Sequence, residues 1–194
     1  MKRVFRIIEP FRVPDGTLVS PFLNPMDSKS RLPIDILSGF SLAAGTIEPK
    51  SSSKIHIMPF VTQVTFVRRG ALRVRMKGPH DENSYSRRLR ADQAVLTAPG
   101  TFFQLINEGS ELCEVLYILS PAYVFEKSGG EVVYDDSVVL EESWHSLKSN
   151  GWNPNAQIPT RKQRRETQQR LRAHRQRVLA WTSNQCSNSA EEFN

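Results

Sequence analysis

The feature that most constrains the fold of this sequence is a series of short β-type segments in its middle, separated by turn-forming residues. The segments are rich in aliphatic and aromatic residues, and Gly, Pro, Asn, Asp and Ser gather between them. They span residues 40–47, 55–58, 61–67, 71–76, 85–89, 94–96, 102–106 and 112–119. Short strands at this spacing are typical of β-sandwiches and β-barrels. The sequence therefore predicts an all-β domain.

The fourth of these segments indicates which face of its strand is buried. Leu72, Val74 and Met76 alternate in it with Arg73 and Arg75. Because successive side chains of a strand point to opposite faces of the sheet, the aliphatic residues share one face and the arginines the other. We expect the aliphatic face to lie in the core and the arginines to lie on the outer face.

The chain divides into five parts by composition. The β-rich part, expected to form a barrel, follows a proline-rich arm and precedes an extension, a helix and a polar tail. The expected bounds are 1–35 for the arm, 36–125 for the barrel, 126–159 for the extension, 160–182 for a basic helix and 183–194 for a disordered tail. The arm is a candidate to pair with the sheet of a second subunit.

The net charge of +6 is concentrated in one segment near the C-terminus. Residues 161–177 hold eight basic residues and one acid, a net of +7, while the rest of the chain has 18 basic and 19 acidic residues. The body of the protein is therefore close to neutral. Any partner that is inferred from charge should contact the helix and not the barrel.

The expected helix over 160–182 has an apolar stripe of only Leu171, Val178 and Trp181. So thin a stripe predicts weak anchoring, and an appended solvated helix is our first interpretation. Weak contact with nucleic acid through 161–177 is the second. The helix lacks the density of Leu and Phe that favours a membrane surface, so no membrane partner is expected.

The rest of the sequence places the protein in a broad class. No run of 18 apolar residues is present, and the first residues turn polar too early for a signal peptide. Two cysteines, Cys113 and Cys186, are too few for a disulfide framework. We therefore expect a cytoplasmic protein, in which Cys113 is an inert thiol of a buried strand.

The order of certain residues in the β-rich region resembles the two short motifs of the cupin family. The matching positions run from the second predicted strand to the seventh: His56, Met58, Gln63, Gly70, Pro99, Gly100, Phe103 and Asn107. The resemblance covers roughly residues 36–121, and its turn residues fit well. It implies a cupin-type jelly-roll β-barrel, and it implies a homodimer because cupins often dimerise.

The positions at which cupins bind metal depart from the family pattern. The first histidine is present as His56, but the second is Met58, the acid is Gln63 and the last histidine is Phe103. A divalent ion needs three or four suitable ligands, usually with a carboxylate among them. We therefore expect no metal cofactor, with a metal ion at His56 as the alternative.

The resemblance also implies a ligand pocket inside the barrel. His56 and Tyr117 are the candidate catalytic residues, because an imidazole and a phenol can move protons without a metal. The candidate ligand-binding residues are Met58, Gln63, Thr65 and Phe103. The alternative is that these side chains are simply core, with Gln63 satisfied by hydrogen bonds within the protein.

Three functions follow from these observations. The first is a small-molecule-processing cupin of the isomerase, lyase or oxygenase type, acting in the barrel, in specialised metabolism. The second is a non-catalytic cupin that binds a small molecule. The third is a nucleic-acid-associated protein that acts through its basic C-terminal helix.

Overall fold

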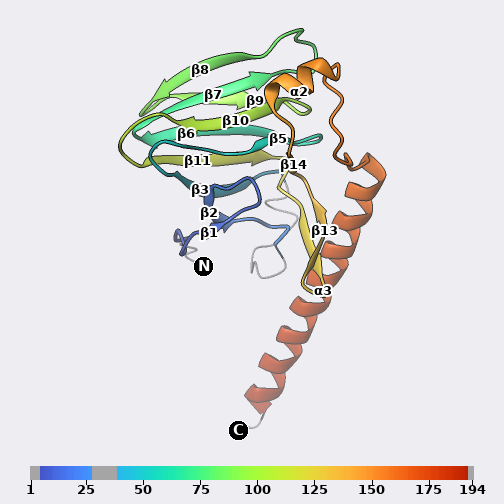
Figure 1. Ribbon diagram of the computed structural model, residues 1–194. Coiled ribbons are helices and arrows are strands. Elements are labelled where there is room, and N and C mark those ends of the chain that lie inside the picture. The colour runs from blue at the N-terminus through green and yellow to red at the C-terminus, as the bar shows by residue number, and fades with distance from the viewer. Residues whose placement is uncertain (1–4, 28–38, 192–194) are drawn as a thin grey trace.

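A computed structural model describes residues 5–27 and 39–191, with side chains as far as residue 178 and at residue 180. Two six-stranded sheets face each other (Figure 1). The first sheet has the order β1 (Phe11–Arg12), β2 (Leu18–Leu23), β3 (Ser41–Ile47), β11 (Cys113–Ser120), β6 (Thr62–Arg69) and β9 (Ala94–Thr97). The second has the order β14 (Val138–Leu140), β5 (Ile55–Ile57), β10 (Phe102–Asn107), β7 (Ala71–Lys77) and β8 (Tyr85–Arg90), while β4 (Ser51–Ser52) pairs with β10.

The eight strands predicted from the sequence are all present, within one or two residues of their expected bounds. The paired strands in both sheets run antiparallel. The alternation in β7 is as predicted, since Leu72, Val74 and Met76 are buried in the core and Arg73 and Arg75 are only half-buried. The expected jelly-roll type of all-β fold is therefore confirmed.

Gly70, one of the turn glycines of the sequence motif, is required where β6 turns into β7. Its φ of 82° lies in the left-handed region that favours glycine. A Cβ atom at this position would lie 2.9 Å from the carbonyl oxygen of Leu112. The tight turn and the close approach of β11 both exclude a side chain here.

The described part of the N-terminal arm adds two strands to the first sheet of its own chain. β2 pairs antiparallel with β3 of the same chain, in the register that places Val19 opposite Gly45. In the first sheet β2 lies next to β3, and β1 is the outermost strand on that side. Pairing of the arm with the sheet of a second subunit stays a prediction.

The extension after the barrel packs on the outer face of the second sheet through residues 144–158. It contains the hairpin of β12 (Phe125–Ser128) and β13 (Glu131–Asp135), then β14, then the short helix α2 (Trp144–Ser149). Trp144 is buried against this sheet, and its Nε1 donates to Gln104 Oε1 at 2.8 Å. The guanidinium of Arg75 lies 4.6 Å above the Trp144 ring. The outer arginine of β7 is therefore a packing partner of α2.

The long helix α3 (Arg161–Glu191) begins with a capping box. Thr160 Oγ1 accepts a hydrogen bond from the Gln163 backbone N–H, and Gln163 Oε1 accepts one from the Thr160 N–H. The helix continues beyond the expected end at residue 182, into the segment that was expected to be disordered. It lies along the β12–β13 hairpin and then runs past it, away from the sheets (Figure 1).

The face of α3 that packs on the barrel differs from the apolar stripe expected from the sequence. Its buried residues are Arg164, Thr167, Leu171 and Arg175, while Val178 is exposed and the side chain of Trp181 is not among those described. Two arginines therefore lie on the docked face. None of the described helices is long and apolar enough to cross a membrane.

Candidate functional site

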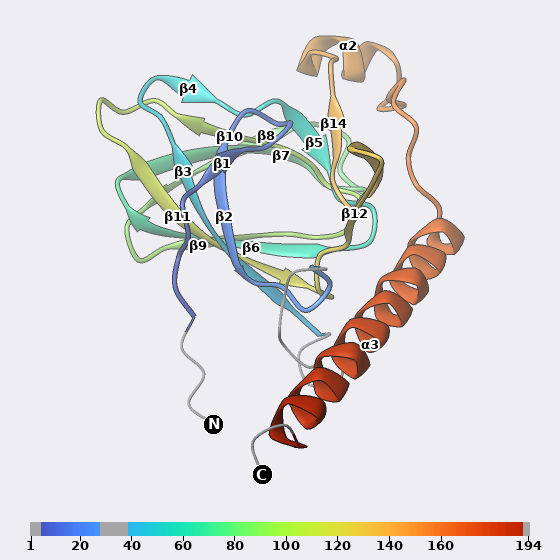
Figure 2. The same cartoon turned by 90° about the horizontal axis from the view of Figure 1, so that it is seen from below.

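The candidate site lies between the two sheets, where the turn that joins β1 and β2 reaches the second sheet (Figure 2). The backbone fixes this contact, because the Lys54 N–H, just before β5, donates to the Asp15 carbonyl oxygen at 2.7 Å. β2 itself lies in the first sheet. Residues of the turn between β1 and β2 therefore lie close to side chains of both sheets.

His56 projects from β5 into this region and is almost completely buried. Its Nδ1 lies 3.1 Å from the carbonyl oxygen of Lys54 and 3.8 Å from Asp15 Oδ2. Since a carbonyl oxygen can only accept, Nδ1 carries the proton, and Nε2 is the basic nitrogen of the neutral ring. Burial lowers the pKa of His56, and the charge of Asp15 opposes that shift only in part.

Asp15 is a site residue that the sequence analysis missed. It is buried, and its Oδ1 accepts hydrogen bonds from the backbone N–H and the hydroxyl of Thr17, at 2.9 and 2.8 Å. In the sequence, Asp15 stands between Pro14 and Gly16, a pattern that predicts only a turn. Its role depends on the pairing of β2 with β3, which no local signal in the arm reveals.

Tyr117 lies on β11, in the first sheet, with its ring over Gly45 of the neighbouring strand β3. A Cβ atom at Gly45 would lie 2.4 Å from Tyr117 Cε2, so glycine leaves the space that the ring fills. The Tyr117 hydroxyl is fully enclosed and makes no hydrogen bond of good geometry within the described residues, but the Thr17 hydroxyl lies beside it and a hydrogen bond between the two would lower the pKa of Tyr117. Burial and the charge of Asp15 raise the pKa of Tyr117.

Gln63 and Thr65 lie side by side on the inner face of β6, as predicted. Both are buried, and Gln63 Nε2 donates to Thr65 Oγ1 at 2.9 Å. In the register of the first sheet, Thr65 is paired with Tyr117. The structure therefore brings together a phenol, a hydroxyl and an amide on two adjacent strands.

Met58 and Phe103 belong to the hydrophobic core between the sheets, in the same cluster as Tyr117. Phe103 is paired with His56 across β10 and β5, and the centroids of the two rings are 3.9 Å apart. These two residues give the polar groups an apolar surrounding. Such a lining strengthens hydrogen bonds and makes an unpaired polar group costly.

The residues at the cupin metal positions do not fit a divalent ion. His56 is joined there by the thioether of Met58, the amide of Gln63 and the ring of Phe103, and the Asp15 carboxylate lies 3.8 Å from the histidine. Over residues 5–27 and 39–191, no group of three or more His, Cys, Asp or Glu side chains is placed to hold a metal ion. Cys113 is buried, and burial raises the pKa of its thiol to about 11, so it stays protonated.

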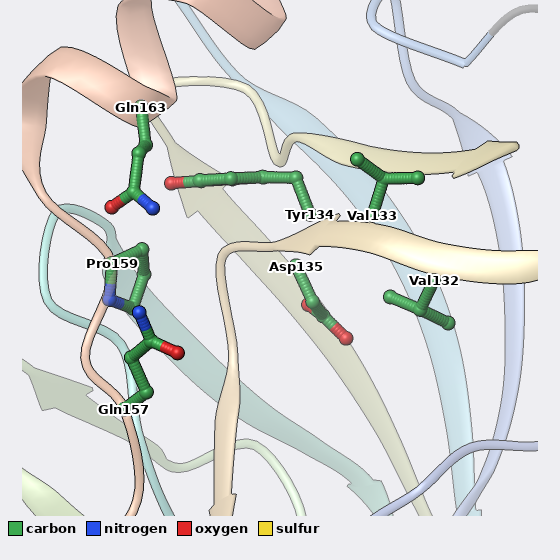
Figure 3. A pocket seen from close by; sticks show the side chains of 7 residues that line it. All are labelled: Val132, Val133, Tyr134, Asp135, Gln157, Pro159 and Gln163. Carbon is green, nitrogen blue, oxygen red and sulfur yellow. The ribbon is translucent and has the colours of Figure 1, made fainter.

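Two surface hollows lie outside this region. One, of about 250 Å³, is formed by β13, the segment before α3 and the first turn of α3 (Figure 3). Its lining consists of Val132, Val133, Tyr134, Asp135, Gln157, Pro159 and Gln163. The other, of about 310 Å³, lies beside β4 and β10. Neither contains a candidate residue of the barrel.

Comparison with known proteins identifies the fold. No family model and no curated protein matches the sequence. Among solved structures, a mutant of Bacillus subtilis oxalate decarboxylase matches with a TM-score of 0.52 and 15% identity, over 69% of this chain and 30% of that one. The formate complex of Lactobacillus farciminis oxalate decarboxylase matches with a TM-score of 0.51 and 14% identity, over 69% of this chain and 33% of that one.

A third solved structure, the cumin domain of Drosophila melanogaster CENP-C, has a TM-score of 0.47 and 14% identity over 59% of this chain and 72% of that one. The two decarboxylase matches show that the chain has a cupin-like fold. The matched region spans about a third of each decarboxylase chain. At this level of identity the likeness concerns the fold alone.

Proposed function

We propose that this chain is a cupin-type protein that binds a small, uncharged organic molecule between its two sheets without a metal ion. The observation that carries the proposal is the hydroxyl of Tyr117, which is enclosed and makes no well-aligned hydrogen bond within the described residues, with the Thr17 hydroxyl as its polar neighbour. A buried polar group that is left unpaired costs about 1–3 kcal/mol. A bound molecule with an acceptor atom at this hydroxyl removes that cost.

The charges around the site favour a neutral ligand. Asp15 is the charged group that acts on both His56 and Tyr117, and the hydrogen-bonding groups beside them, the Lys54 carbonyl and the Thr17 side chain, are neutral. An anionic ligand would lose its hydration and gain no opposite charge in return, which is unfavourable in a buried site. Oxalate, for which the similar decarboxylases are named, and formate, which one of them holds, therefore fit this site less well than a carbonyl or hydroxyl compound.

The hydrogen-bonding capacities define the ligand further. Tyr117 offers a donor, and the neutral His56 offers an acceptor at Nε2 because its Nδ1 proton is bound to the Lys54 carbonyl oxygen. Gln63, held by Thr65, adds a side-chain amide. A small molecule with a carbonyl oxygen could accept a hydrogen bond from Tyr117. If it also carried a hydroxyl or amide proton, it could donate that proton to Nε2 of His56.

Proton-transfer catalysis is the second candidate function, and one contact favours it. Asp15 and the Lys54 carbonyl oxygen both lie at Nδ1 of His56, an arrangement that orients the ring and leaves Nε2 free to take a proton. Because burial lowers the pKa of His56, the ring is neutral at pH 7 and is in the form that a general base requires. Tyr117 would then donate a hydrogen bond to the oxygen on which negative charge develops.

Retention of a co-purified molecule tests the binding proposal. Protein purified without chelators is denatured, and the released small molecules are quantified by mass spectrometry for wild type and two variants. Tyr117→Phe removes the unpaired hydroxyl, so we expect at least tenfold less of the molecule. Tyr134→Phe makes the same chemical change at an equally buried tyrosine, 6% exposed like Tyr117, outside the site, and should retain it.

Two results would contradict the proposal. Equal retention by wild type and Tyr117→Phe would show that the hydroxyl makes no contact with the molecule. Absence of any stoichiometric molecule from wild type, together with a Tyr117→Phe variant more stable than wild type, would indicate that the hydroxyl is an unsatisfied core group. If the protein is a proton-transfer catalyst, the His56→Gln variant should bind the molecule but not convert it.

A further inference from the structure

The orientation of α3 on the barrel is fixed by buried polar contacts. The Arg164 guanidinium donates from Nε to Asp136 Oδ1 at 2.9 Å, and Arg175 donates from Nη1 to the carbonyl oxygen of Pro25. Between them, Leu171 packs in an apolar cluster with residues of the barrel and of the arm. The helix therefore cannot rotate about its axis without breaking buried hydrogen bonds.

This orientation turns a second set of basic residues outward. Arg161, Arg165 and Arg172 are exposed, and Gln168 lies between the last two. The four positions are separated by four, three and four residues, so they share one face of the helix. At about 1.5 Å rise per residue, the arginines follow one another at about 6 Å and about 10 Å along the axis.

We propose that this arginine row of α3, Arg161, Arg165 and Arg172, binds the phosphate backbone of duplex DNA. Guanidinium groups bind phosphate oxygens in a bidentate manner and stay charged at any physiological pH. An α-helix fits the major groove of B-form DNA, whereas the major groove of an RNA duplex is too narrow for it. The docked side of α3 holds the row in place, so little conformational entropy is lost on binding.

Other polyanions fit this surface less well. The described exposed side chains of α3, as far as residue 178, include no Phe, Tyr or Trp, so the stacking of single-stranded bases would depend on His174 alone among aromatic rings. Val178 is the one large apolar residue exposed among them, so this face lacks the apolar half of a membrane-binding helix. Outside residues 161–177 the chain has 18 basic and 19 acidic residues, so its net positive charge comes from this segment.

The test measures the affinity of the full chain for a fluorescent DNA duplex of about 20 base pairs by anisotropy, over a series of salt concentrations. In one variant Arg161, Arg165 and Arg172 are all replaced by Gln, which keeps the helix propensity and leaves the docked face unchanged. The matched control carries three Gln substitutions at Arg68, Arg90 and Lys148, exposed residues outside α3. Both variants lower the net charge by the same three units.

We expect wild type to bind with a Kd between about 1 and 100 μM near physiological salt, weakening steeply as salt rises. The α3 variant should lose at least tenfold in affinity, and its slope of log K against log salt should fall by about 3. The control variant should bind within about twofold of wild type. Circular dichroism checks that both variants keep the helix content of wild type.

Three outcomes would overturn the proposal. No binding of the duplex by wild type at low salt would do so directly. Equal losses in the two variants would show that only net charge matters and not the row on α3. Tighter binding to vesicles of anionic phospholipid, or to a single strand of the same length, than to the duplex would assign the surface to another class of partner.

Discussion

The carboxylate of Asp136 and the guanidinium of Arg164 form a buried ion pair that joins the segment after β13 to the first turns of α3. Asp136 is fully buried, and its two oxygens accept from Arg164 Nε at 2.9 Å and Nη2 at 3.1 Å. Asp136 also accepts from the Val124 backbone N–H and the Tyr134 hydroxyl. The pair explains how a helix with few apolar residues docks on a barrel.

Loss of Arg164 should therefore destabilise the protein strongly. In Arg164→Met the Asp136 carboxylate stays buried without its cation, which costs about 3–5 kcal/mol in the free energy of unfolding. Urea denaturation followed by circular dichroism measures this cost. The control is Arg170→Gln, which breaks the exposed pair with Glu126 and should cost less than about 1 kcal/mol. Similar effects of the two variants would contradict the role of the buried pair.

Asp135 should make the protein less stable as pH rises. Burial raises its pKa from 3.8 to about 6, so the folded state holds the proton more tightly than the unfolded state does. The stability that this proton contributes is present below about pH 4 and is lost as pH rises through about 6. Asp135→Asn keeps an acceptor for the Tyr123 hydroxyl and removes the titrating group.

We expect Asp135→Asn to raise the free energy of unfolding at pH 8 by up to about 3 kcal/mol relative to wild type, from the shift of about two pKa units. At pH 4 the two proteins should be equally stable. Urea denaturation at both pH values makes the comparison. An equal gain at pH 4 and pH 8 would show that the effect of the substitution is not due to ionisation of Asp135.

His56 should make the protein less stable as pH falls, which is the opposite of the effect of Asp135. Burial lowers its pKa below 6.5, so the unfolded state takes up the proton first as pH falls. The stability that neutral His56 contributes is present above about pH 6.5 and is lost as pH falls through the lowered pKa of the folded state. Thermal denaturation of wild type and His56→Gln between pH 5 and pH 8 measures this, and the Tm of the variant should fall less on acidification. Parallel curves would contradict a buried, neutral His56.

Much of the fold follows from local patterns, and the site follows only in part. The alternation in β7 and the turn at Gly70 depend on residues that are close together in the sequence, so the strands of the barrel could be predicted. Asp15 could not be assigned to the site, because it reaches His56 only through the pairing of β2 with β3. The docked face of α3 was also missed, since Arg164 looks like a solvent-exposed residue until Asp136 is placed beside it.

Gly45 should be intolerant of any side chain. An added Cβ would lie 2.4 Å from Tyr117 Cε2 and 2.9 Å from its hydroxyl oxygen, so Gly45→Ala must displace the Tyr117 ring. We expect a loss of about 1–3 kcal/mol in unfolding free energy and release of any bound molecule. Gly39→Ala is the control, because a Cβ there meets no atom within 4 Å. Unchanged stability of Gly45→Ala would show that the ring does not lie over this strand as described.

Native mass spectrometry of the intact wild-type chain, purified without chelators and without added metal, tests the central claim most directly. It reports subunit number, bound metal and retained organic molecule in one spectrum. The account predicts a subunit mass increased by one small organic molecule and by no metal ion, with the increase absent from Tyr117→Phe. A stoichiometric divalent ion on the wild-type subunit would contradict the interpretation of Met58, Gln63 and Phe103.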